Sequence, residues 1–227
     1  MSLFFLFMLF PFLNEDLIAP CEDREEMLEY LQDFSEEEYT IVNTADARFY
    51  VKEEKKLEED ANVLHFLERY IKEGTTVVDF GAQNGARAFF FSRFVGLQGN
   101  VLAFESNAEL FRELFWNAML NNVQNMKLFY KVQSLDSLEL TDVSVMYIDG
   151  SGREDIFLNN AKKTIQACKP ALILNMIGGV PMERHDRYIK EVYDNRIERF
   201  RDLGYTIQRI DKDHYLALPT GKKSPGA

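Results

Sequence analysis

The feature that most constrains the fold is a run of β-forming residues that passes directly into an aspartate and a glycine loop. The segment TTVVDFGAQNG occupies residues 75–85, with Asp79 at the end of the apolar run. Such a run is typical of a buried parallel strand. Gly81 and Gly85 allow the backbone to turn sharply and to approach a ligand closely. Residues 86–94 are expected to form a helix whose N-terminal amides face the loop, which completes the strand, turn and helix of a nucleotide-binding unit.

The next predicted strand indicates what the loop binds. Residues 100–105 (NVLAFE) end in Glu105, one βαβ unit downstream, where a carboxylate can hold a ribose diol. The loop has the pattern D-x-G-x-x-x-G and lacks the third glycine in the spacing that a dinucleotide pyrophosphate requires. The pattern therefore favours S-adenosylmethionine, which carries no phosphate, over NAD.

Composition limits the size and the partners of the chain. With 227 residues and 46% apolar content, it is long enough for one domain with a substantial core. Its formal net charge of −11 disfavours nucleic acid as a partner, because the long-range field repels a polyphosphate. Cys21 and Cys168 stand in no metal-ligand spacing, so we expect ordinary thiols of a reducing compartment and a cytoplasmic location.

An uninterrupted apolar run, LFFLFMLFPFL, occupies residues 3–13. It is shorter than the roughly 20 residues of a transmembrane helix, and it lacks the cationic region and cleavage site of a signal peptide. Three contacts stay open for it: its own domain or a dimer mate, a membrane surface, or a neighbouring domain. We expect residues 1–38 to form an apolar and then acidic extension, 39–219 the methyl-donor-binding domain, and 220–227 a disordered tail.

The remaining periodicities alternate between helix and strand. After the N-terminal run, the sequence predicts a short helix, a small hairpin, a helix before the central strand, and then alternating strands and helices. These further helices are expected at residues 22–34, 58–72, 106–120, 154–167 and 183–203, and the strands at 39–42, 48–51, 126–130, 143–148, 171–176, 205–210 and 214–218. The pattern predicts an α/β fold: a seven-stranded mixed sheet covered on both faces, a three-layer sandwich that closes with an antiparallel hairpin.

Four motifs in order resemble those of the FkbM-type methyltransferases. They are VVDFGAQNG at residues 77–85, LAFESN at 102–107, SLDSL at 134–138 and YIDGSGRE at 147–154. The resemblance spans residues 77–219 and marks a divergent, shortened member, with Ser151 and Asn175 where the family tends to have Glu. It implies a class I methyltransferase Rossmann-like fold and methyl transfer from S-adenosylmethionine to oxygen, commonly a hydroxyl of a sugar or natural product.

The motifs assign the cofactor-binding residues. Glu105 is expected to accept hydrogen bonds from the ribose diol, and Asp79 to orient the loop near the positively charged methionine end of the cofactor. The full set of cofactor-binding residues is Asp79, Gly81, Ala82, Asn84, Gly85, Glu105, Ser106 and Ser134.

Methyl transfer to a hydroxyl also requires a group that removes the proton. Asp149, at the carboxyl end of the fourth strand of the main sheet, and His185, after the fifth, are the catalytic candidates. A merely structural His185 is the alternative, and neither His65 nor His214 is expected to be catalytic. No metal site is predicted, although Asp149 with Asn175 leaves open a magnesium or manganese ion.

The sequence is compatible with three functions. The first is an O-methyltransferase that acts on a carbohydrate or small-molecule hydroxyl. The second is a non-catalytic Rossmann-like module that binds a partner through the apolar N-terminus. The third, an RNA 2′-O-methyltransferase, would require a Lys-Asp-Lys-Glu arrangement and a basic groove, which the sequence does not indicate.

Overall fold

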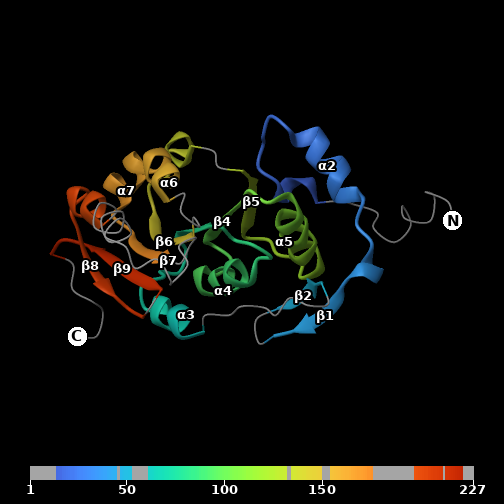
Figure 1. Ribbon diagram of the computed structural model, residues 1–227, viewed down its shortest axis with the longest axis horizontal. Coiled ribbons are helices and arrows are strands. Elements are labelled where there is room, and N and C mark those ends of the chain that lie inside the picture. The colour runs from blue at the N-terminus through green and yellow to red at the C-terminus, as the bar shows by residue number, and fades with distance from the viewer. Residues whose placement is uncertain are drawn as a thin grey trace, which may run out of the picture.

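The computed structural model describes residues 14–44, 47–52, 61–131, 134–149, 154–175, 197–211 and 213–221. Its centre is a seven-stranded sheet with the strand order β5-β4-β3-β6-β7-β9-β8 (Figure 1). The strands are β3 (Thr76–Phe80), β4 (Asn100–Glu105), β5 (Met126–Tyr130), β6 (Val143–Asp149), β7 (Ala171–Asn175), β8 (Tyr205–Arg209) and β9 (His214–Pro219). The first five are parallel, and β9 is antiparallel to both neighbours. This confirms the predicted mixed sheet and its closing hairpin.

Helices cover both faces of the sheet, each over its own apolar cluster (Figure 1). On one face lie α3 (Ala61–Glu68), α4 (Ala86–Val95) and α5 (Ala108–Leu120). On the other lie α6 (Glu154–Asn160), α7 (Lys162–Cys168) and the helical residues 197–202. The central strand β3 is buried along its whole length, as its apolar run predicts. The fold is therefore the predicted three-layer α/β sandwich with a Rossmann-like sheet.

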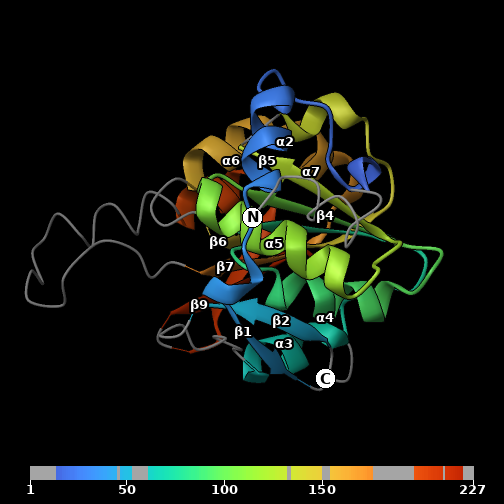
Figure 2. The same cartoon turned by 90° about the vertical axis from the view of Figure 1, so that its right-hand side faces the viewer.

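The chain before β3 packs against this sandwich. Ile18 forms a parallel bridge with Leu128 of β5, and α2 (Arg24–Gln32) lies on α5, where the Trp116 indole donates to the Leu31 carbonyl at 3.0 Å. The hairpin of β1 (Thr40–Asn43) and β2 (Arg48–Val51) forms a separate two-stranded sheet beside α5 (Figure 2). Residues before and after position 38 thus share one core, and the division there stays a prediction.

One predicted helix is divided in two. Residues 154–167 were expected to be continuous, but α6 ends at Asn160 and α7 begins at Lys162. The Asp136 carboxylate accepts hydrogen bonds from the amides of Lys163 and Thr164 at 3.0 and 2.8 Å. This side chain from elsewhere in the sequence satisfies the first amides of α7, so a second helix can begin there.

Other predictions meet the described residues only in part. The helix expected at 58–72 is seen as α3 over Ala61–Glu68, and the one expected at 183–203 is described from residue 197. It stops before Gly204, which has φ +81°. The apolar run 3–13, His185 and the tail after residue 221 lie outside the described residues. Within the described part of the chain, no helix has the length and apolar character to span a membrane.

Candidate functional site

The loop between β3 and α4 turns at the carboxyl edge of the sheet. Gly81 and Gly85 have φ values of +80° and +96°, a region that side chains disfavour. A Cβ atom at Gly81 would lie 2.2 Å from the backbone oxygen of Asp149, and one at Gly85 would lie 2.7 Å from Leu114. Gly81 was expected to permit the approach of a ligand. Its lack of a side chain also permits the approach of β6, so this glycine is part of the packing between β3 and β6.

Hydrogen bonds hold the loop on the next strand. The amides of Gly81 and Ala82 both donate to the Phe104 carbonyl at 2.9 Å, and the Gly85 amide donates to the Ala82 carbonyl at 2.9 Å. The Asn84 side chain accepts from the Ala86 amide at 3.3 Å, at the start of α4. Gly81, Ala82, Asn84 and Gly85 therefore lie together beside the end of β4.

Glu105 ends β4 with its carboxylate turned onto backbone amides. Oε2 accepts from the Gln83 amide at 2.8 Å, and Oε1 accepts from the amides of Ser106 and Asn107 at 2.7 Å each. A carboxylate offers about four lone-pair sites, so roughly one, on Oε2, is left. One ribose hydroxyl can bind there directly, and a second must displace an amide. This differs from the expectation that Glu105 is free to accept both hydroxyls.

Asp79 lies in the interior below the loop. Its side chain is fully buried, and the Arg87 guanidinium donates to Oδ1 through Nε at 3.3 Å. Burial raises the pKa of the Asp79 carboxyl, and the neighbouring guanidinium opposes that shift. Oδ2 has no hydrogen-bond partner among the described residues. A buried acceptor without a partner is costly, and because this side chain has no exposed surface, a ligand's donor reaches it only if the loop or Arg87 moves.

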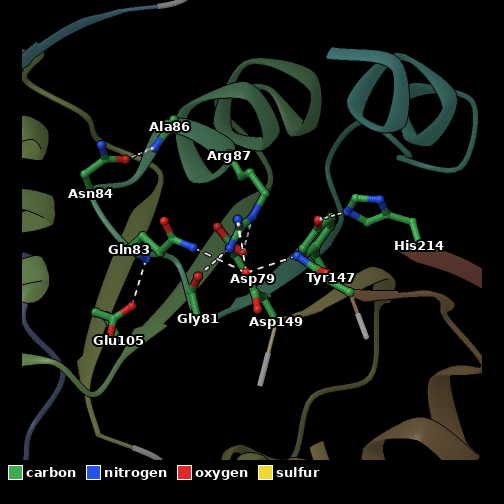
Figure 3. A network of polar contacts seen from close by, with 11 residues as sticks. Asp79, Gly81, Gln83, Asn84, Ala86, Arg87, Glu105, Tyr147, Asp149 and His214 are labelled. Atoms are coloured by element: carbon green, nitrogen blue, oxygen red, sulfur yellow. Dashed lines mark hydrogen bonds and ion pairs between the residues drawn. The ribbon is translucent and has the colours of Figure 1, made fainter. Parts of the chain in front are cut away.

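Arg87, from the first turn of α4, connects the loop to β6. It also donates to the Gly81 carbonyl, and Nη1 lies 3.7 Å from Asp149 Oδ2 (Figure 3). Asp149 further accepts from the side-chain amides of Gln83 at 3.3 Å and Asn175 at 3.4 Å. The Asp149 carboxylate is thus held by one guanidinium and two amides at the end of β6.

The possible divalent cation at Asp149 and Asn175 finds no further support. The two residues are register partners on β6 and β7 and bond to each other through the Asn175 amide. The Arg87 guanidinium already supplies positive charge there. Among the described residues, no three or more His, Cys, Asp or Glu side chains are grouped so as to hold a metal ion.

Three further residues were predicted for the site: Ser106, Ser134 and His185. Ser106 contributes its amide to Glu105. Ser134 precedes the short 3-10 helix η3 (Leu135–Leu138), and its side chain makes no capping bond. His185 lies in the segment 176–196, outside the described residues, so its role stays a prediction.

Four polar residues of the site were not anticipated from the sequence: Arg87, Gln83, Tyr147 and His214. His214 is buried, with Nε2 2.9 Å from the Tyr147 hydroxyl and Nδ1 3.0 Å from the Asp211 carboxylate. The Arg87 guanidinium lies over the Tyr147 ring at 4.4 Å (Figure 3). Two signals were available: an arginine within an apolar helix segment, and a histidine at the start of an apolar strand that is buried on both faces.

Solved structures of similar fold include several methyltransferases. A protein assigned as an rRNA methylase from Clostridium thermocellum matches 72% of this chain and 96% of its own, with a TM-score of 0.55 and 14% identity. Fibrillarin of Aeropyrum pernix, solved with natively bound S-adenosyl-L-methionine, matches 83% and 85%, with a TM-score of 0.50 and 15% identity. A protein assigned as an O-methyltransferase from Klebsiella pneumoniae matches 90% and 93%, with a TM-score of 0.53 and 16% identity. No protein-family model and no curated protein sequence matches this chain.

Proposed function

We propose that this protein is an S-adenosylmethionine-dependent methyltransferase that methylates a hydroxyl of a sugar or glycan. The observation that carries the proposal is the meeting of three carboxylates at one edge of the sheet. Asp79, Glu105 and Asp149 end or nearly end the strands β3, β4 and β6, which are adjacent and parallel. Ligands of open α/β sheets bind outside this edge, beside a glycine turn such as the one found here.

The charges at this edge fit the cofactor. Around the glycine loop lie three carboxylates, Asp79, Glu105 and Asp149, and one guanidinium, that of Arg87. S-adenosylmethionine brings a sulfonium and an ammonium group, which this excess of negative charge favours. Asp79 is fully buried, so its contribution is the field of its carboxylate beneath the loop rather than a direct contact with the cofactor. The open acceptor position on Glu105 Oε2 is suited to a ribose hydroxyl.

The cofactor supplies an electrophilic methyl group, and the protein must place the acceptor oxygen and accept its proton. Asp149 is our first candidate for that proton, because it ends β6 at the same edge as the loop. Its two amide partners and the Arg87 guanidinium fix the direction of the carboxylate. His185 remains a second candidate on sequence grounds.

The choice of acceptor rests on charge and on the sequence motifs. The net charge of −11 disfavours a polyanion, and the FkbM-type motifs are associated with hydroxyl acceptors. The alternative of a non-catalytic module is favoured by one observation. Three of the roughly four acceptor positions of Glu105 are already taken by backbone amides without a ligand.

The test is methyl transfer from S-adenosylmethionine with an isotopically labelled methyl group. Neutral glycans, small sugars and a structured RNA are offered separately, and Asp149→Asn serves as the matched control. Label in the glycan or sugar fraction, lost in Asp149→Asn, supports the proposal. Label in RNA alone moves the acceptor to nucleic acid, and the absence of transfer to every acceptor supports the non-catalytic module.

A further inference from the structure

Asn117 of α5 and Asn121, the residue that caps the C-terminus of this helix, bond to the backbone of β2 as a neighbouring strand would. Asn117 accepts from the Tyr50 amide at 2.6 Å and donates to its carbonyl at 3.5 Å, and Asn121 exchanges the same two bonds with Arg48 at 2.9 and 2.7 Å. Four residues of a helix rise about 6 Å, and two residues of a strand about 6.6 Å. The side-chain amides at i and i+4 therefore match the backbone groups of alternate strand residues.

Asn117 makes one further contact that Asn121 does not. Its amide nitrogen donates to the backbone carbonyl of Asn84, in the glycine loop, at 2.9 Å. Asn117 is fully buried, and it thus joins the hairpin and the loop through a single side chain. The described bonds of the Asn121 side chain go to Arg48 and to the Asn117 carbonyl.

The loop that Asn117 contacts is conformationally demanding. Gln83 has φ +53° without being a glycine, and Gly85 has φ +96°. Such conformations persist where surrounding contacts fix them. The bond to the Asn84 carbonyl fixes the orientation of the peptide group between Asn84 and Gly85. This peptide group comes immediately before α4.

We propose that Asn117 is a positioning residue for the methyl donor. It acts through Asn84 and holds the loop in the conformation that binds S-adenosylmethionine. The proposal rests on the proposed function for the identity of the ligand, but the loop conformation it describes exists without the ligand. The hairpin thereby becomes part of the support of the site, because the same side chain holds both.

The test compares Asn117→Ala with Asn121→Ala. Both variants lose the two backbone bonds of one hairpin residue, so both are expected to lower the urea midpoint. Only Asn117→Ala is expected to raise the dissociation constant of S-adenosylmethionine in calorimetry, by about 3- to 10-fold, as the loss of one hydrogen bond predicts. An equal rise in both variants, or none in Asn117→Ala, overturns the proposal.

Hydrogen exchange of the ligand-free proteins separates this proposal from the proposed function. The amides of residues 82–85 are expected to exchange faster in Asn117→Ala and at the wild-type rate in Asn121→Ala. If the wild type binds no S-adenosylmethionine, the proposed function fails, and unchanged loop exchange in Asn117→Ala would also refute the positioning role. Should Asn117→Ala not fold, the neutral and shorter Asn117→Ser takes its place, and the same two measurements apply.

Discussion

Replacing Gly81 with alanine is expected to destabilise the fold as well as to weaken the site. At φ +80° a side chain costs about 1–2 kcal/mol. The added Cβ would also lie 2.2 Å from the Asp149 backbone oxygen, and overpacking of this kind costs about 1–3 kcal/mol. The two effects sum to about 2–5 kcal/mol. The site weakens because the displaced atoms belong to the end of β6.

Gly74 provides the matched control. It has φ +79°, and a Cβ there would meet no atom within 4 Å. Gly74→Ala therefore carries the conformational cost alone. Its free energy of unfolding in urea should be about 1–3 kcal/mol higher than that of Gly81→Ala. With a slope on the order of 2 kcal/mol per molar urea, the midpoints should differ by roughly 0.5–1.5 M. Equal midpoints would refute the inference that Gly81 is required by its contact with β6.

Four further predictions follow from the polar contacts. Glu105→Gln should raise the dissociation constant of S-adenosylmethionine by about 10- to 100-fold, because a charge-assisted bond is lost; calorimetry showing an unchanged constant would remove Glu105 from the site. Arg87→Met leaves the Asp79 carboxyl buried without its cation and should lower the unfolding free energy in urea by about 3–5 kcal/mol, whereas a loss below about 1 kcal/mol would contradict the buried pair. Asp149→Asn should reduce kcat by about 10²- to 10⁴-fold with little change in cofactor affinity, and wild-type turnover would exclude Asp149 as the base. Partial burial raises the pKa of Asp211, but hydrogen bonds from the backbone and from His214 together outweigh it and hold this pKa below its ordinary value of 3.8. The stability that these bonds confer is therefore lost as the pH falls below about 4. Asp211→Asn should show a shallower loss of stability in acid, and an identical profile would contradict this prediction.

The sheet could be predicted from the sequence because each strand has its own local apolar pattern. The apolar run that ends at Asp79 and the apolar run after His214 both report local burial. The division between α6 and α7 was not accessible in the same way. It depends on Asp136, which lies 27 residues before the Lys163 amide that it accepts from, and no local pattern reports such a contact.

The sequence predicts where the site lies but not which hydrogen bonds its residues make. The motif predicts that Glu105 and the glycine loop lie at one edge, and the structure places them there. The sequence could not show that Glu105 is bonded to three amides or that Gly81 packs on Asp149. These facts depend on how separate strands meet, and the same holds for the contact between His214 and Tyr147.

The most direct test of the account is a calorimetric titration of the wild-type protein with S-adenosylmethionine. The three carboxylates at one sheet edge, beside the glycine turn, predict saturable binding at one site per chain. Adding salt should weaken the binding moderately, because buried charges are screened less than exposed ones. The absence of any binding heat up to millimolar cofactor, with the protein shown to be folded, would contradict the assignment of this edge as a methyl-donor site.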